Sequence, residues 1–316
     1  MHPTLIRRIL ILALTLAPFT FSIGRAGAEP PKVLTSIKPL HSLASGVMEG
    51  IGQPTLLVRA TASPHTYTLR PSDARAIAQA DVLFWIGPGY ESFMAKAVRS
   101  LPRQSVAMEI AKVEGIVLLP TREGGVWADD GHGHSHGHKH RAPEPERDMH
   151  LWLDPRNGQA VVTAMAATLA ARDPANAAAY RANAAAVTAR LVALDDALAK
   201  QLAPIAAKPF IVFHDAYQYL ERRYGLTAAG SITVSPDRPP GPRRITELRR
   251  TVAERGAACV FSEPQFTSAL VETVVEGTGA KAAVLDPLGT AVADGKDAYA
   301  GLMQNLANSL TGCLNR

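Results

Sequence analysis

Length, composition and charge limit what this chain can be. The sequence has 316 residues, of which 47% are hydrophobic, so it can bury a sizeable core and is not a disordered chain. That length suits one large domain or two of ordinary size. The formal net charge is +5 and the basic residues are dispersed apart from short pairs, which argues against a nucleic acid partner.

Residues 1–28 have the pattern of a cleavable signal peptide. A short basic segment precedes an apolar run at residues 9–23, which a proline interrupts and which is too short for a comfortable membrane span. Small residues just before position 29 suit a signal peptidase. We therefore expect an exported mature chain that begins near Glu29 and has no membrane span.

Segments with strand character alternate with segments of helical character from residue 29 to about residue 120. The run DVLFWIG is apolar throughout, as in a strand with both faces covered. Such alternation predicts an α/β fold with mostly parallel sheets. The expected strands are at residues 33–36, 54–60, 81–87 and 105–110. The expected helices are at residues 40–50, 70–80 and 91–101, and a turn at Lys38 and Pro39 is expected before the first of them.

A long helix is predicted to separate two α/β halves. Asp173 and Pro174 form a good helix start, and no helix-breaking residue follows until about Leu202. A helix of this length is about 43 Å long and could cross the whole molecule. We expect an N-terminal α/β domain at residues 29–172, a linker helix at 173–202 and a C-terminal α/β domain at 203–316.

Residues 121–148 interrupt the alternation, because Gly, His, Pro and charged residues dominate there. We expect a flexible exposed loop. Glycine and serine between the histidines of GHGHSHGHKH leave the backbone mobile, so metal binding there must offset ordering entropy and should be weak and exchangeable. The segment is either an accessory that gathers zinc or a solvated loop without a metal role. Its histidines are His132, His134, His136, His138 and His140.

Three other histidines lie next to apolar segments. His65 is in a turn after a strand, His214 ends the strand PFIVFH, and His150 opens the short apolar stretch HLWLDP. Ligand groups in α/β sheets gather at the carboxyl ends of strands, so two facing domains would bring these side chains together. Three imidazoles and a fourth oxygen ligand suit zinc. Asp286 also ends an apolar strand and is a candidate fourth ligand, whereas His41, inside a helix pattern, is assigned a structural role.

Other chemistries find little support in the sequence. It contains no HExxH, P-loop, GxGxxG or GxSxG motif. An exported zinc hydrolase would need a general base beside its metal, and no carboxylate is tied to the histidine motifs in that way. Glu263, which follows a strand, is more simply a structural hydrogen-bond acceptor.

The chain has two cysteines, Cys259 and Cys313. In an exported protein, such a pair is a candidate for one disulfide, which would tie the C-terminus to the body of the domain. Two separate buried thiols are the alternative.

Long motifs in chain order resemble those of the periplasmic zinc-binding components of high-affinity zinc ABC importers, the ZnuA-type solute-binding proteins. They are TSIKPLHSLASGVMEG, SPHTYTLRPSDARAIAQADVLFWIG, DMHLWLDPRN, FIVFHDAYQYLERRYGL, FSEPQF and LDPLG, and they cover nearly the whole mature chain. The resemblance implies two similar α/β domains joined by one long helix, with metal in the cleft between them. It implies ligands at His65, His150 and His214, and it supports a disulfide between Cys259 and Cys313.

The same resemblance implies a function. A member of this family is not an enzyme but captures Zn²⁺ in the periplasm and delivers it to an inner-membrane permease; we expect a monomer. Manganese-binding relatives replace the third histidine by a carboxylate, so His214 favours zinc, and a manganese or generalist divalent-metal carrier is the alternative. Some zinc members have Glu before the first ligand, where this chain has Pro64. The fourth ligand would then be water or Asp286.

Overall fold

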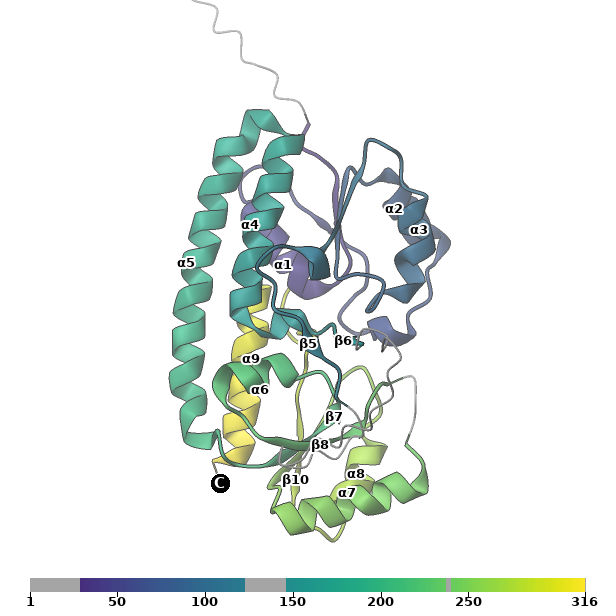
Figure 1. Cartoon of the computed structure of the whole chain (residues 1–316), viewed down its shortest axis with the longest axis vertical. Coiled ribbons are helices and arrows are strands. Elements are labelled where there is room, and N and C mark those ends of the chain that lie inside the picture. Colours follow the sequence, from purple (N-terminus) through teal and green to yellow (C-terminus); the bar gives the residue numbers. More distant parts are fainter. Residues whose placement is uncertain (1–28, 123–145, 237–239, 316) are drawn as a thin grey trace, which may run out of the picture.

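The computed structural model describes residues 29–122, 146–236 and 240–315. The expected signal peptide and the clustered histidines of positions 132–140 therefore lie outside the described residues. The described chain forms two four-stranded parallel sheets with helices on both faces, one sheet above the other in Figure 1. This confirms the predicted α/β class. Within these ranges, no helix is at once long enough and apolar enough to cross a membrane.

The first sheet shows why its central strand, β3 (Val82–Trp85), is apolar at every position. Val82 and Phe84 pack in the core that also contains Leu40 of the first helix, while Leu83 and Trp85 pack in a second cluster on the other face. The strand order is β2-β1-β3-β4, with β1 (Val33–Thr35), β2 (Thr55–Leu56) and β4 (Val106–Glu109), and the covering helices are α1 (Lys38–Val47), α2 (Pro71–Gln79) and α3 (Ala95–Arg99).

Two expectations for this half need correction. The turn expected at Lys38 and Pro39 is the first turn of α1, where a proline is tolerated because the first amides of a helix have no partner within it. The strand expected at residues 54–60 is paired only at Thr55–Leu56. The amides of Leu57 and Val58 still donate to the carbonyls of Thr35 and Ser36, both at 2.9 Å. The chain then meets the second half at Ala60, whose carbonyl accepts from Thr290.

The second sheet repeats this arrangement. Ile211 and Phe213 of β7 face a cluster formed with Val252 and Val271 from the helices below the sheet, while alternate residues face the main core. The strand order is β10-β9-β7-β8, with β7 (Phe210–His214), β8 (Ala228–Thr233), β9 (Cys259–Ser262) and β10 (Lys281–Val284), and the helices are α6 (Gln218–Tyr224), α7 (Pro242–Arg255), α8 (Ala269–Val275) and α9 (Ala298–Leu314).

The long helix α5 (Ala177–Leu202) runs beside both halves, antiparallel to α4 (Pro155–Arg172), as Figure 1 shows. Its 26 residues span about 39 Å. The predicted start at Pro174 is a short 3₁₀ turn that leads into the α-helix. The buried apolar side chains of the helix are Tyr180, Ala184, Val187, Leu191, Leu198 and Leu202. Asp195 is buried on the same helix and accepts hydrogen bonds from Arg223 and the Tyr224 hydroxyl.

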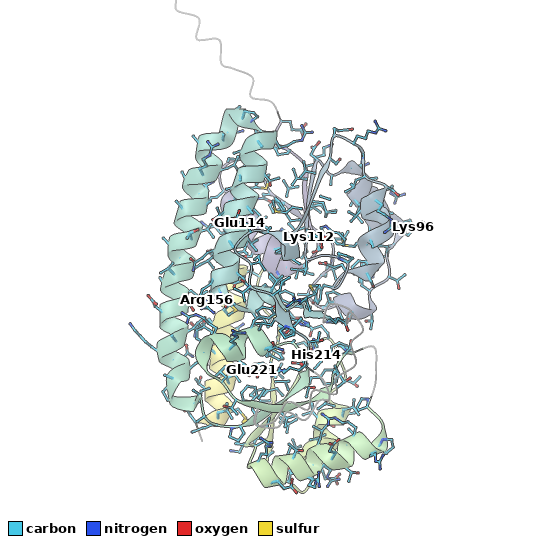
Figure 2. All side chains as sticks on the ribbon, in the orientation of Figure 1. Lys96, Lys112, Glu114, Arg156, His214 and Glu221 are labelled. Carbon is cyan, nitrogen blue, oxygen red and sulfur yellow. A yellow bond between two sulfur atoms is a disulfide. The ribbon has the colours of Figure 1, made fainter. Side chains whose placement is uncertain are left out.

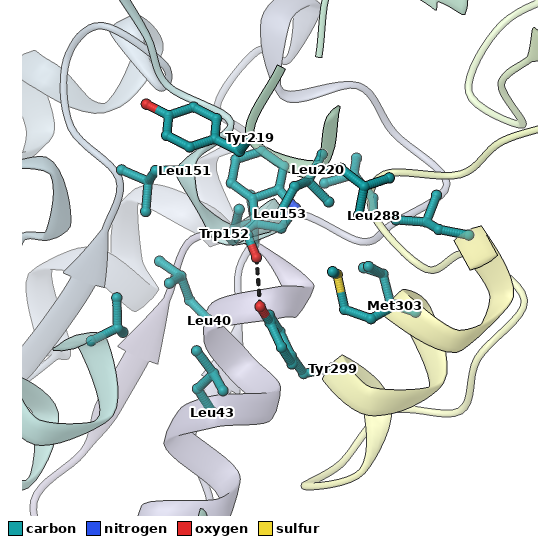
Figure 3. Packing of buried hydrophobic residues seen from close by; sticks show 14 of the residues in the cluster. Leu40, Leu43, Leu151, Trp152, Leu153, Tyr219, Leu220, Leu288, Tyr299 and Met303 are labelled. Carbon is teal, nitrogen blue, oxygen red and sulfur yellow. Dashed lines mark hydrogen bonds between the residues drawn. The ribbon is translucent and has the colours of Figure 1, made fainter. Parts of the chain in front are cut away.

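One continuous core connects the two halves. The C-terminal helix α9 packs on both α1 and α5. Inside this contact the Tyr299 hydroxyl donates to the carbonyl of Trp152 at 2.6 Å (Figure 3). The indole N–H of Trp152 in turn donates to the carbonyl of Pro287 at 2.9 Å. The halves are therefore joined by shared packing and hydrogen bonds in addition to the long helix.

A two-stranded antiparallel pair crosses from the first half to the second. It consists of β5 (Leu119–Pro120) and β6 (Arg147–Asp148), and the amide of Thr121 donates to the carbonyl of Glu146 at 2.9 Å. The expectation of an irregular loop over residues 121–148 is therefore wrong at its C-terminal end, where Arg147 and Asp148 form β6. Backbone pairing of this kind needs no apolar periodicity, so the sequence pattern gave no sign of it.

Cys259 and Cys313 form a disulfide, as expected. It joins β9 to α9 across a sequence separation of 54 residues. Because α9 also contacts α1 and α5, the bond fixes the helix that the two halves share.

Replacing both cysteines by alanine should reduce the free energy of unfolding by about 2–4 kcal/mol, since the unfolded chain gains the entropy that the cross-link removes. Urea denaturation of the variant measures this change. The unaltered chain unfolded in a reducing agent is the control and should behave like the variant. An unchanged midpoint in both would show that the disulfide does not stabilise the fold.

Candidate metal centre

Three histidines reach one point from three different segments. His65 lies in the 3₁₀ turn Pro64–Thr66, where the chain has left the first sheet. His150 lies two residues after the end of β6 and immediately before the 3₁₀ turn Leu151–Leu153. His214 is the last residue of β7, and Figure 2 shows it between the two halves.

The ring nitrogens of these residues converge. The Nε2 atom of His150 lies 3.2 Å from Nε2 of His65 and 3.2 Å from Nε2 of His214. One ligand atom from each residue lies within 4.8 Å of the other two. Two imidazole nitrogens bound to one tetrahedral zinc ion are about 3.3 Å apart, given Zn–N bonds of about 2.0–2.1 Å. The cluster therefore has the spacing of a metal site.

Two buried carboxylates orient two of the rings. Asp148 accepts from Nδ1 of His150 at 2.8 Å and from its backbone amide at 3.0 Å. Glu263 accepts from Nδ1 of His214, at 2.7 Å and 2.8 Å from its two oxygens. A carboxylate at Nδ1 keeps the proton there and leaves the Nε2 lone pair for a metal. Glu263 is thus a hydrogen-bond acceptor, and the sequence did not reveal that its partner is a histidine of the cluster.

Burial controls the charge in this region. Burial, with a smaller contribution from the charge of His214, lowers the pKa of His150 well below its ordinary value. The ring is therefore neutral at neutral pH, which is the form that binds metals. Burial also raises the pKa of Asp148 to about 7. A cation bound at the cluster would favour the ionised form of this buried carboxyl.

An aromatic wall supports the rings. The ring centroid of Tyr90 lies 4.9 Å from that of His65 and 5.3 Å from that of His150. The loop that carries Tyr90 is held by Glu91, whose carboxyl accepts from the amides of Ile86 and Gly87 at 3.2 Å and 2.9 Å, and from the Ser36 hydroxyl. Sequence reasoning missed Tyr90 and Glu91, because neither residue type nor spacing distinguishes them from core residues.

The structure does not bring Asp286 into the three-histidine group. Its Oδ1 accepts from the amides of Leu288 and Gly289 at 3.0 Å and 3.1 Å, and its Oδ2 accepts from the amide of Thr290. The side chain thus holds the turn after β10. The strand-end position that suggested a ligand is also the position at which a carboxylate can cap a turn. His41, as expected, serves the fold: its Nε2 lies 3.1 Å from the carbonyl of Pro54.

The cluster opens into a cleft between the halves. His65, Tyr90 and His150 form part of its wall, Asp215 lines it on the side of the second half, and Arg122 reaches it from the first half. Because three nitrogens converge beside this opening, a metal bound to them would have a fourth position toward solvent. The arrangement can hold a cation between the halves and exchange it with solvent.

Two α/β halves around three converging imidazoles define a solute-binding protein for a metal ion. The sequence matches, over residues 33–313, the family described as zinc-uptake complex component A, periplasmic, and the chain belongs to this family. It is 47% identical over 310 residues to the high-affinity zinc uptake system protein ZnuA of Brucella suis biovar 1 (strain 1330), covering 91% of this chain and 93% of the relative. For the protein of the same description from Paracoccus denitrificans (strain Pd 1222), identity is 39% over 310 residues, covering 92% and 93%.

Solved structures share the fold. A crystal structure of ZnuA aligns with a TM-score of 0.72 at 25% identity, covering 89% of this chain and 99% of that one. The periplasmic zinc binding protein TroA from Treponema pallidum aligns with a TM-score of 0.75 at 19% identity, covering 91% and 100%. The likeness over both full lengths confirms the predicted arrangement of two α/β units and a long helix.

Replacing Glu91 by Gln should reduce the pH dependence of stability. Burial raises the pKa of Glu91 from 4.5 to about 7, so the folded state holds this proton more tightly than the unfolded chain does. The resulting stabilisation is fully present below pH 4.5 and is lost as the pH rises through about 7. Urea unfolding at about pH 5 and about pH 8 should show a smaller decrease in the free energy of unfolding for the variant. If the free energy of unfolding decreased by the same amount in both proteins, Glu91 would not be the group that causes this pH dependence.

Proposed function

We propose that this protein captures Zn²⁺ in the periplasm with His65, His150 and His214 and delivers it to an inner-membrane permease. The observation that carries the proposal is the convergence of three Nε2 atoms, with His150 3.2 Å from each of the others. Membership of the zinc-uptake family supports zinc as the cargo. Imidazole nitrogen is also a ligand type that suits zinc.

Water is the proposed fourth ligand. Pro64, which precedes the first histidine, has no side-chain donor atom, and Asp286 is engaged by the amides of the turn after β10. A water ligand leaves the fourth position exchangeable, because no protein group has to move for it to be vacated. Such a site suits a carrier that has to release its cargo.

A carrier also fits the nearby carboxylates better than a hydrolase does. A zinc hydrolase needs a carboxylate that can take a proton from the metal-bound water. Asp148 and Glu263 are instead engaged by Nδ1 of His150 and His214. We therefore propose that the protein acts by binding and is not an enzyme.

Export and assembly follow from the sequence and the family. The apolar segment within residues 1–28 supports a cleavable signal peptide, and the family description is periplasmic. An uptake component of this kind needs a membrane partner, for which an ABC permease is the proposed candidate. We propose that the protein meets this partner as a monomer.

Zinc binding should decrease sharply when any one of the three histidines is replaced by alanine. Each variant loses one of three nitrogen ligands. Altering only the hydrogen-bond partner of a metal ligand reduces affinity by about 10–100-fold, so we expect the loss of a ligand itself to reduce zinc affinity by at least about 100-fold. Calorimetry in a chain that lacks residues 131–140 measures the main site alone. His41→Ala is the matched control and should bind zinc normally. Unchanged binding in all three variants would show that the site is elsewhere.

The histidines of residues 131–140 are proposed to gather zinc for the main site. Titration of the chain from residue 29, with and without that segment, should show one tight site in both proteins and additional weak sites only in the longer one. This outcome is expected because glycine-separated histidines must be ordered before they can share a metal. If removal of the segment abolished the tight site, the histidines of residues 131–140 would be the main zinc site and the three-histidine cluster would not.

A further inference from the structure

One carboxylate in the wall of the cleft beside the histidine cluster is bound by an arginine. Asp215 directly follows His214 and lines the same cleft as His65 and His150. Both of its oxygens accept from Nε of Arg122 at 3.1 Å, and Oδ1 also accepts from a terminal guanidinium nitrogen. Asp215 is not part of the group of atoms that could hold a metal.

Arg122 is well placed for this task. It leaves the first half beside β5 and reaches across to the start of α6, where its terminal nitrogens also donate to the two oxygens of Glu221, both at 2.9 Å. The guanidinium is therefore fixed by two carboxylates, and its side chain is only 21% exposed. The planar guanidinium group binds one carboxylate at each edge, so separating it from Asp215 would break several charged hydrogen bonds.

The nature of this carboxylate matters for metal choice. Carboxylate oxygens suit Mn²⁺ and other hard cations, whereas imidazole nitrogens suit zinc. Asp215 is adjacent in sequence to a histidine of the cluster and lies in the wall of the same cleft, whereas Asp148 and Glu263 are engaged by ring nitrogens on the far side of His150 and His214. Among the described residues, the group that could hold a metal consists of the three histidines and does not include Asp215, which is engaged by Arg122.

We propose that Arg122 is a specificity-determining residue, which keeps Asp215 out of the coordination sphere and thereby preserves the preference of the site for Zn²⁺ over Mn²⁺. This inference rests on the proposed zinc site at the three histidines. Arg122 acts through Asp215 and does not itself touch the metal.

Arg122→Met is the main test. Released from the arginine, Asp215 should supply an oxygen ligand, and the ratio of the dissociation constants for Mn²⁺ and Zn²⁺ should fall by about 10-fold. Equilibrium dialysis of the full chain from residue 29 against mixtures of the two ions measures this ratio, with protein in excess over metal so that only the tightest site fills. Adding Asp215→Asn to Arg122→Met should restore the original ratio, because an amide is a weaker ligand than a carboxylate.

The chain offers a matched control in Arg223→Met. Arg223 forms the same kind of bidentate pair with Asp195, with side chains 26% and 8% exposed, against 21% and 8% for Arg122 and Asp215. Loss of this pair should lower stability but leave the metal ratio unchanged. If Arg122→Met does not fold, Arg122→Lys is the second variant; it keeps the charge without the fork and should lower the ratio to a smaller extent.

Three outcomes would overturn the inference. The ratio could remain unchanged in a folded Arg122 variant, or it could change equally in Arg223→Met. A large loss of zinc affinity in Asp215→Asn alone would mean that Asp215 is already a ligand. In each of these cases the unaltered chain still binds zinc, so only the role of Arg122 fails. If the unaltered chain binds no zinc, the proposed function fails with it.

Discussion

The binding site depends on where a proton sits on two imidazole rings. Asp148 and Glu263 hold that proton on Nδ1 of His150 and His214, and only then do both Nε2 lone pairs face a common point. Both carboxylates are buried, and in a low-dielectric interior their charge needs a counterpart nearby. A divalent cation bound at the proposed site would supply it. The affinity of that site would then come from the two carboxylates as well as from the imidazole nitrogens.

This arrangement is useful only if the three rings keep their distances, and the core between the halves ensures that they do. The segment after His150 is fixed at its tryptophan, which donates to Pro287 in the second half and accepts from Tyr299 of α9. Helix α9 is in turn tied to β9 by the disulfide at Cys259. The three histidines thus share one rigid frame, which favours local movement at the cleft as the proposed route of metal release.

Sequence reasoning predicted the parts of this design that periodicity and residue type encode. The alternation of strands and helices and the long helix α5 follow from periodicity, whereas the three histidines were indicated by their positions next to apolar segments together with the resemblance to the zinc-binding family. Sequence reasoning failed where the role of a residue depends on a partner that is distant in the chain. Asp286 and Glu263 both follow apolar strands, yet one caps a turn and the other orients His214. Arg122 gave no signal, because the carboxylates that hold it are more than 90 residues away in the chain.

The pairing of β5 with β6 has a consequence for how the protein can evolve. The amide of Thr121 donates to the carbonyl of Glu146, so the two ends of the segment between them lie side by side. The entropic cost of closing such an insertion grows only slowly with its length, by roughly 0.6 kcal/mol for each doubling. Selection can therefore lengthen, shorten or recompose the histidine-rich insertion with little effect on the fold or on the buried site. The proposed gathering of zinc and the proposed holding of zinc could in this sense change independently of each other.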